Sequence, residues 1–244
     1  MLGRKENTIM KFKLLVRDIK FGFTKSLKYI LLLLLFLFVP LISYISFSKN
    51  FSDIINYFIY PDFELNINIL KYNLYFISIQ IFMLFTFNKY IFDDLFTYNK
   101  LILTRYKSRT MICISKIIFI VVSNTILIFV FSFYAYLCLN VFGVKMLNKM
   151  VFFKIFVCYT IGAISLSTFN LLISLFFKEI IGFLFSTLFI ILNLFLKTTV
   201  FPGGGYTSIL LNDICLIYSL GYNIIITLIS MVLVVFFYKK VDLI

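Results

Sequence analysis

The sequence predicts an all-α polytopic membrane protein, in which six transmembrane helices follow an amphipathic interfacial helix and both termini are cytosolic. Three observations lead to this prediction. Of the 244 residues, 62% are hydrophobic and only 14% are charged, whereas a soluble domain is about half apolar. The apolar runs are near the roughly 20 residues that a helix needs to cross a bilayer, and they are continuous rather than alternating. Positive charge gathers on one side of the predicted membrane.

The segment 1–28 is expected to form a basic amphipathic helix that lies in the inner membrane interface. From residue 9 onward, apolar side chains alternate with Lys and Arg in an imperfect helical pattern, which suits an interfacial helix. The alternative is a plain positively charged anchor for the next helix.

Six apolar segments are predicted to span the membrane as helices. The fourth and fifth are separated only by Lys178 and Glu179, which predicts a tight helical hairpin. The predicted spans are 29–47, 72–90, 111–139, 155–177, 180–196 and 217–238.

The orientation follows from the distribution of Lys and Arg. With a cytosolic N-terminus, most of the 23 basic residues fall on the cytosolic side, in segment 1–28, in the loop 93–109 and at the end of the chain. The positive-inside rule therefore predicts that both termini are cytosolic. The many Ile, Phe, Asn, Lys and Tyr residues are typical of AT-rich bacterial genomes, so we expect a bacterial plasma membrane.

Several kinds of chemistry are disfavoured on the sequence. The chain has no histidine, which excludes histidine-dependent triads and zinc sites, and no Gly-x-x-x-x-Gly-Lys loop for ATP. The four cysteines show no metal-binding spacing and are expected to be packing residues. We therefore expect no catalytic residue, no metal and no cofactor on this chain, and no nucleic acid as partner.

The predicted positions of the acidic residues bear on whether this chain couples transport to ions. They are expected in loops or at helix ends rather than inside a span, which weighs against an ion-coupled transporter and an intramembrane protease. The residues considered are Asp53, Asp62, Glu64, Asp93, Asp94, Glu179, Asp213 and Asp242.

The one sizeable cytosolic connection is the loop 93–109. Acidic residues open it and basic residues close it, a pattern that complements the dipole of a short helix. Leu95 and its apolar neighbours could form an edge that docks onto a partner. A solvated basic loop is an equally open interpretation.

The segment from Tyr98 to Lys116, with Leu-Thr-Arg-Tyr-Lys-Ser-Arg at 103–109, resembles the cytosolic coupling region of type-2 ABC exporter permeases. The layout of the whole chain is similar to that family, whereas the motif covers about twenty residues. The resemblance implies a permease with two partner ATPase subunits that carry ATP and Mg. It also implies that the following residues contact the ATPase: Asp93, Asp94, Tyr98, Lys100, Arg105, Lys107 and Arg109. The hairpin tip Lys178-Glu179 is a second candidate contact.

A break between the last two spans is expected at Pro202, Gly203, Gly204 and Gly205, because proline and glycine interrupt a helix. Irregular backbone at membrane depth needs protein or water beside it. In the resembled family, short re-entrant helices here cap the outer end of the path, so these residues are candidates for an outer gate. An ordinary external turn is the alternative.

These features favour the membrane subunit of an ATP-driven exporter, as a homodimer or with a related permease. Small permeases of this layout resemble exporters of antimicrobial or amphipathic peptides, such as the lantibiotic-immunity and phenol-soluble-modulin types, which implies a peptide cargo. The alternatives are an exporter of lipids or drugs, or a stand-alone immunity or stress protein without transport. A channel is disfavoured, since no span has a regular polar stripe.

Overall fold

The computed structural model describes residues 13–32, 80–81, 84–97, 108–141, 149–196, 202–203 and 213–240. Within these ranges the chain is all-α, as predicted. A helix covers residues 13–32, and a second covers 84–92 and runs into the π-helix η1 (Asp93–Thr97). Four longer helices follow, which are α5 (Arg109–Val141), α6 (Lys149–Phe177), α7 (Glu179–Leu196) and α8 (Asp213–Lys240).

Three of these helices are long and apolar enough to cross a membrane. The qualifying stretches are Arg109–Val130 in α5, Phe156–Phe177 in α6 and Ile217–Lys240 in α8, which agree with the third, fourth and sixth predicted spans. The fifth, 180–196, coincides with α7, whose apolar stretch Glu179–Asn193 is shorter. The first two predicted spans, 29–47 and 72–90, lie largely outside the described residues.

The helix that begins at residue 84 does not stop at Tyr90, where the predicted second span ended. It continues through η1 to Thr97, so the first part of the predicted coupling loop is helical. Leu95 is completely buried. The interpretation of Leu95 as part of an exposed docking edge is therefore wrong, because this side chain belongs to the core.

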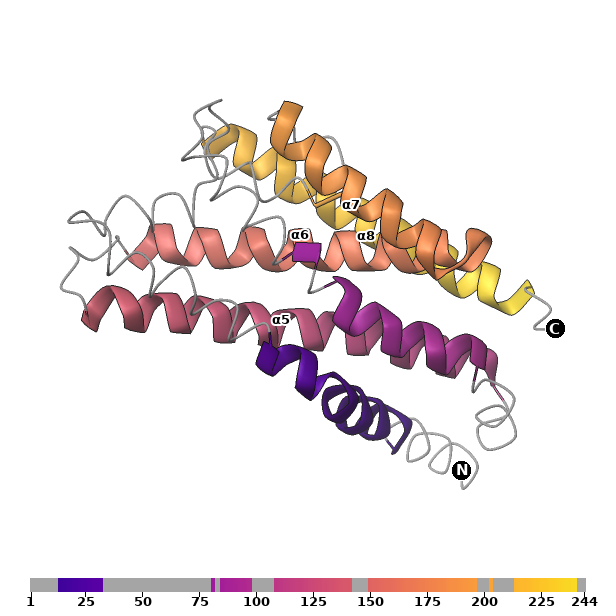
Figure 1. The fold of residues 1–244 in the computed structure, drawn as a ribbon. Helices are drawn as coiled ribbons and strands as arrows, with labels where there is room; N and C mark the ends of the chain where they lie inside the picture. Colours follow the sequence, from indigo (N-terminus) through magenta and orange to yellow (C-terminus); the bar gives the residue numbers. More distant parts are fainter. Residues whose placement is uncertain are drawn as a thin grey trace, which may run out of the picture.

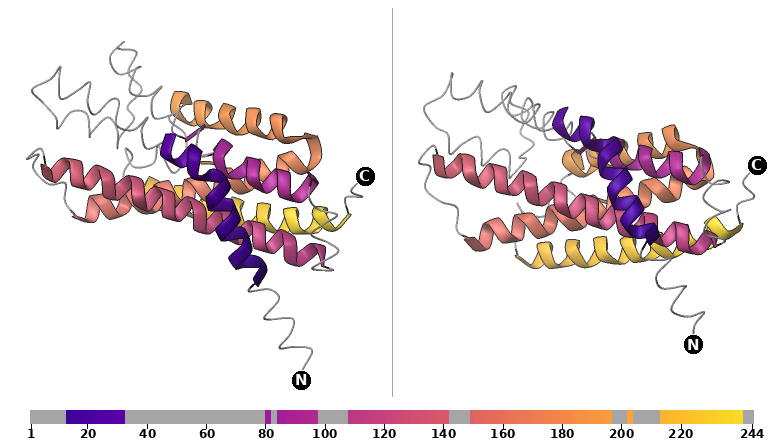
Figure 2. Two further views of the ribbon diagram at one scale, coloured as in Figure 1. Left: turned by 60° about the horizontal axis from the view of Figure 1, so that its bottom comes forward. Right: turned by 90° about the horizontal axis from the view of Figure 1, so that it is seen from below.

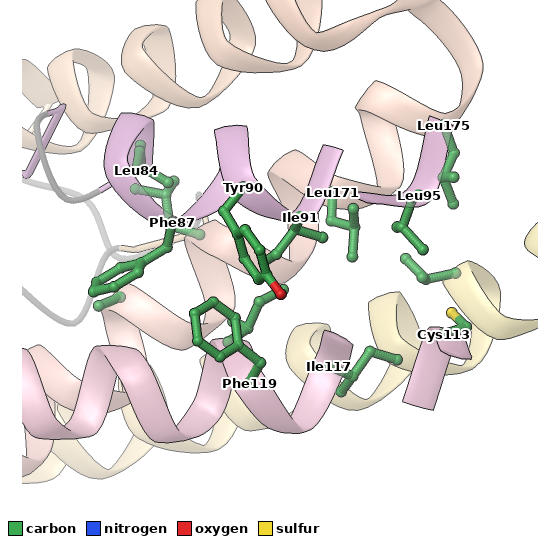
Figure 3. Close-up of a cluster of buried hydrophobic side chains, with 14 of the residues drawn as sticks. Leu84, Phe87, Tyr90, Ile91, Leu95, Cys113, Ile117, Phe119, Leu171 and Leu175 are labelled. Carbon is green, nitrogen blue, oxygen red and sulfur yellow. The ribbon is translucent and has the colours of Figure 1, made fainter. Parts of the chain in front are cut away.

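The hydrophobic core forms where the helix of residues 84–97 packs against α5 and α6. Figure 3 shows its apolar side chains facing those of the two longer helices. Tyr90 meets Phe119 of α5 edge-to-face, with ring centroids 5.2 Å apart, while Leu171 and Leu175 complete the cluster from α6. This packing sets the position of η1 at the end of the helix.

The helix of residues 13–32 crosses α5 obliquely (Figure 2). Only a narrow stripe of its residues is buried. Its buried positions recur every four residues, at Leu14, Asp18, Gly22 and Ser26, which is the spacing of one helix face. Glycine is required in this stripe, because a Cβ at Gly22 would lie 2.3 Å from the ring of Phe119. Leu14 is the one large apolar residue of the stripe. The small residues and the charged Asp18 allow this helix to approach α5 closely.

Polar side chains join the long helices along their buried faces. Asn124 of α5 donates a hydrogen bond to Ser167 of α6 over 3.2 Å. Hydroxyl and amide groups commonly hold membrane helices together in this way. The polar residues scattered along α5 and α6 are buried, namely Ser123, Asn124, Ser165, Ser167, Thr168 and Asn170.

Several chain segments come together at one end of the bundle, here called the loop end (Figure 1). It contains the end of η1, the start of α5, the turn between α6 and α7, and the end of α8. Arg109 donates a hydrogen bond to the carbonyl oxygen of Lys239 over 3.4 Å, which joins α5 to α8. The predicted hairpin is confirmed, since only Lys178, with a φ of 117°, separates α6 from α7.

Glycine at 182 allows the close approach of α7 to α6, and its replacement tests this contact. A Cβ at Gly182 would lie 2.2 Å from Ser174 Oγ and 3.0 Å from the carbonyl oxygen of Asn170. We expect Gly182→Ala to lower the free energy of unfolding by about 1–3 kcal/mol, as overpacking does. The melting temperature in detergent should fall accordingly.

Gly221→Ala is the matched control, because a Cβ there has no neighbour within 4 Å. Alanine is favoured over glycine inside a helix by up to about 1 kcal/mol, so this variant should melt at the same or a slightly higher temperature. Equal melting temperatures for the two variants would contradict the proposed close contact.

Candidate functional site

A group of charged and polar side chains is buried where the helix of residues 13–32, the helix of residues 84–97 and α5 meet. The first helix supplies two members, the second supplies two, and α5 supplies two. We call this group the ion cluster, and it consists of Arg17, Asp18, Tyr90, Asp94, Ser115 and Lys116.

Asp18 is at the centre of the ion cluster and is completely buried. Its Oδ1 accepts a hydrogen bond from Lys116 Nζ over 2.9 Å, and its Oδ2 accepts one from Ser115 Oγ over 2.5 Å. Arg17, the neighbouring residue, also donates to Oδ1, and the hydroxyl of Tyr90 lies 3.5 Å from it. The carboxylate therefore has a donor on each of the three helices.

Lys116 is equally buried, and its ammonium group joins the two carboxylates. It donates to Asp18 and to Asp94 Oδ2, and it lies 3.4 Å from the Tyr90 hydroxyl. The same ammonium lies 4.6 Å from the centroid of the Tyr90 ring, within the range of a cation–π contact. Arg17 completes the network with a 2.8 Å ion pair to Asp94.

The charges of the ion cluster balance. Two carboxylates face two cations, and each carboxylate pairs with both of them. Burial of the guanidinium works against its charged form, but the charges of Asp18 and Asp94 together outweigh this, and the pKa of Arg17 is raised above its ordinary value. A buried charge is tolerated only when it is paired and hydrogen-bonded, and this arrangement meets both conditions.

The ion cluster encloses the two ends of the predicted coupling loop. Asp94 lies just before segment 98–107, and Ser115 and Lys116 follow it by about two helical turns of α5. Both ends are therefore tied to each other and to Asp18 of the N-terminal helix. The arrangement can hold the residues that flank segment 98–107 in one position relative to three helices.

Two carboxylates are buried although neither lies inside a predicted span. Asp94 is at a helix end, as predicted, but it is buried, and the burial of Asp18 was not predicted. The sequence does carry a signal for it. Asp18 is four residues from Leu14 and four from Gly22, so it lies on the packed stripe rather than among the exposed lysines. Lys116 similarly lies four residues from Ile112 and from Ile120, on the buried face of α5.

The other residues predicted to contact the ATPase are divided between described and undescribed parts of the chain. Asp93 is partly exposed and lies outside the ion cluster, while Arg109 contacts the end of α8. Tyr98, Lys100, Arg105 and Lys107 lie outside the described residues. Contact of all seven with an ATPase stays a prediction.

The hairpin tip lies close to the start of the predicted coupling loop. Burial raises the pKa of Glu179, the Asp93 carboxylate raises it further, and Lys89 lowers it. The second candidate contact, Lys178-Glu179, therefore lies at the same end of the bundle as Asp93, and the two carboxylates interact electrostatically.

A second polar group surrounds the predicted outer break. Pro202 and Gly203 are buried. The amide of Asn193 in α7 donates to the carbonyl oxygen of Pro202 over 3.1 Å, and the backbone N–H of Gly203 donates to Asn223 Oδ1 of α8 over 3.0 Å. Ser165 of α6 donates to the same Asn223 oxygen. Side chains of α7 and α8 thus satisfy the irregular backbone, as its burial requires, and Ser165 of α6 helps to hold Asn223 in place. Gly204 and Gly205 lie outside the described residues.

In the part of the chain that the structure describes, no three His, Cys, Asp or Glu side chains gather as a metal site. Cys113 and Cys158 are both completely buried. The ion cluster is therefore the strongest candidate site among these residues.

The balance of charge in the ion cluster predicts the effect of removing Lys116. Lys116→Met leaves two carboxylates with one cation, and losing one partner of a buried ion pair costs about 3–5 kcal/mol. We expect a loss of this size in the free energy of unfolding, measured by denaturant titration in detergent. The double variant Asp18→Asn/Lys116→Met removes one charge of each sign, so it should be less destabilised than Lys116→Met alone.

Lys20→Met is the control, since Lys20 is exposed and exposed substitutions stay within about 0.5 kcal/mol. Equal losses in Lys116→Met and Lys20→Met would contradict the assignment of Lys116 as a buried ion-pair partner.

No curated protein and no solved structure matches this chain. A family model does match, over residues 54–244, and its description is "Protein of unknown function (DUF2705)". Because the match covers most of the chain, this protein, whose described residues are helical and include three candidate membrane spans, belongs to the DUF2705 family.

Proposed function

We propose that this chain is the membrane subunit of an ATP-driven exporter in a bacterial plasma membrane, with both termini in the cytosol. One observation carries the proposal. The ion cluster ties both ends of segment 98–107 to the N-terminal helix through Asp18, Asp94 and Lys116. This is the arrangement that a loop pushed by a partner needs in order to move the membrane helices.

The physical argument concerns how force passes from the loop. A loop with loose ends would absorb a displacement, whereas buried ion pairs with hydrogen bonds on all sides resist separation. Displacement of segment 98–107 would therefore move α5 and the helices of residues 13–32 and 84–97 together. Rigid-body motion of packed helices is a common form of switching between two states.

The energy source in this proposal is a separate ATPase subunit, present in two copies. The sequence offers no phosphate-binding loop, so ATP and Mg belong to that partner. The hairpin tip at Glu179 lies at the same end of the bundle as η1, which adds a second surface at the loop end against which the partner can rest. Arg109 and the end of α8 extend the same surface.

The proposed partner within the membrane is a second copy of this chain or a related permease. α8 exposes a broad row of apolar side chains, including Ile225, Leu228 and Val232, which lipid or another permease must cover. Two permeases would enclose a path for a hydrophobic or amphipathic peptide. Pro202 and Gly203, held by α6, α7 and α8, would close the outer end of that path.

An ion-coupled transporter is the competing class of protein, because the ion cluster contains buried ionisable groups. Such groups within membrane proteins often carry ions. Two features favour a linking role. Each carboxylate is already paired with two cations, and Lys116 is only about 10 Å along α5 from Arg109. The charges of the ion cluster thus balance, and Lys116 lies near one end of α5. A stand-alone immunity protein remains the second alternative.

Co-purification with a candidate ABC ATPase from the same genome tests the exporter proposal. Both proteins are co-expressed, and the tagged permease is captured from detergent. We expect the ATPase to be retained, and its hydrolysis to rise at least about twofold when a cationic amphipathic peptide is added. Arg105→Ala/Lys107→Ala should reduce retention of the ATPase, while Lys13→Ala/Lys20→Ala, which removes two exposed charges from the N-terminal helix, should not.

A permease that purifies alone under these conditions would overturn the exporter proposal and favour the stand-alone protein. Transport in vesicles that needs a proton gradient but no ATP would favour the ion-coupled class.

The ion cluster should be needed for coupling rather than for ATPase binding. We expect Asp18→Asn/Lys116→Met to retain the ATPase while losing most of the stimulation by peptide, because the loop is present but no longer fixed to the helices. The comparison uses ATP hydrolysis of complexes matched for ATPase content. Unchanged stimulation in this variant would show that the loop acts through other contacts.

A further inference from the structure

A cavity of about 290 Å³ lies between the helix of residues 13–32 and the helix of residues 84–97. Its base is formed where these helices touch, at the hydrogen bond from Ser26 Oγ to the carbonyl oxygen of Thr86. The volume equals the share of about ten water molecules in the liquid, which is room for more than a single ion. We call this cavity the lysine pocket.

Three lysines line the lysine pocket. Lys25 and Lys28 come from the N-terminal helix, three residues apart and hence on one face, and Lys89 comes from the other helix. Asp93 is the one acidic residue in the lining. The lining therefore carries an excess of two positive charges, which favours an anion.

Aromatic rings hold the lysine side chains near the pocket. The ammonium of Lys28 lies 4.9 Å from the centroid of the Tyr29 ring, and that of Lys89 lies 5.4 Å from the Phe85 ring. Lys25 lies 5.8 Å from the ring of Tyr90. Cation–π contacts restrain such side chains, so their positions are partly set before a ligand binds.

Exposed apolar side chains adjoin the lysine pocket. They favour a lipid over a small soluble anion as the ligand. Leu31 and Leu32, one turn beyond Lys28, are each more than half exposed, and so is Leu27. Phe85 is also exposed, and its ring contacts that of Tyr29 edge-to-face at 6.1 Å. A ligand with a phosphate in the pocket would therefore find an apolar surface for attached acyl chains.

We propose that the lysine pocket binds the headgroup of an anionic phospholipid of the phosphatidylglycerol type. The phosphodiester would be held by Lys25, Lys28 and Lys89, and Asp93 would accept a hydrogen bond from a hydroxyl of the glycerol head. Basic pockets between membrane helices on the cytosolic side bind anionic lipid headgroups in this way. The pocket does not depend on the exporter function.

Lipid titration of the delipidated full chain, followed by native mass spectrometry, tests the proposal. The probes are phosphatidylglycerol and, for comparison, phosphatidylcholine and phosphatidylethanolamine. We expect a first phosphatidylglycerol to bind at least about tenfold more tightly than the other two. Lys25→Gln/Lys28→Gln/Lys89→Gln should weaken that first binding step by about tenfold or more, since each lysine near an anionic headgroup contributes severalfold.

The control variant Lys13→Gln/Lys20→Gln/Lys239→Gln removes the same number of charges from exposed positions, two of them on the same helix. It should bind the first phosphatidylglycerol within about twofold of the unaltered chain. Equal weakening in both triple variants would overturn the proposal, because binding would then follow net charge. Melting temperatures in neutral detergent establish that both variants are folded.

Competition with soluble anions shows whether the pocket binds a phospholipid or a free phosphate compound. Glycerol phosphate and inorganic phosphate at millimolar concentration should leave phosphatidylglycerol bound, because they lack the acyl chains. Their displacement of the lipid from the unaltered chain, or a first binding step with no preference among the three lipids, would overturn the proposal for a lipid.

Discussion

The attraction between Asp18 and Lys116 is the constraint on which the rest of the described structure depends. Neither charge is stable alone in a buried position, since desolvation of an unpaired ion costs far more than a helix contact returns. Their pairing requires the N-terminal helix to approach α5 closely, which Gly22 permits by leaving room for the ring of Phe119. It also requires Asp94 to be near, and η1 brings it there by extending the helix past Tyr90.

The polar groups differ in kind along the helices. Among the described residues, the buried charged side chains are Asp18, Asp94 and Lys116 of the ion cluster, and Lys116 lies about 10 Å from the start of α5. Neutral amides and hydroxyls serve further along, as in the bond from Asn124 to Ser167, and Asn223 satisfies the backbone at the break. Neutral groups cost less to bury than charges do. This order places the strongest and most directional interactions at the end where the predicted coupling loop joins the helices.

The sequence predicts the long helices well and the ion cluster poorly, for a physical reason. Length and continuous apolarity are properties of one segment, so 180–196 and 217–238 agree closely with α7 and α8. The partner of a charge is a property of two segments. Asp18 lies in a basic stretch, where charges suggest a solvated face. Its spacing from Leu14 and Gly22 is a weak signal of burial, and the partners that stabilise it, Ser115 and Lys116, come from α5. The extension of the helix to Thr97 depends in the same way on Leu95 reaching the core.

Tyr90 belongs to both the ion cluster and the lysine pocket, and this has a consequence for the behaviour of the molecule. Its hydroxyl lies within reach of Asp18 and Lys116, while its ring lies near Lys25. A displacement of the N-terminal helix that separates Asp18 from Lys116 must also change the spacing of the lysines. An anion held by those lysines therefore favours the arrangement in which the ion cluster is intact, and by linkage an intact cluster favours the bound anion. The joint between the three helices would then respond to the lipid around it as well as to the loop that it anchors.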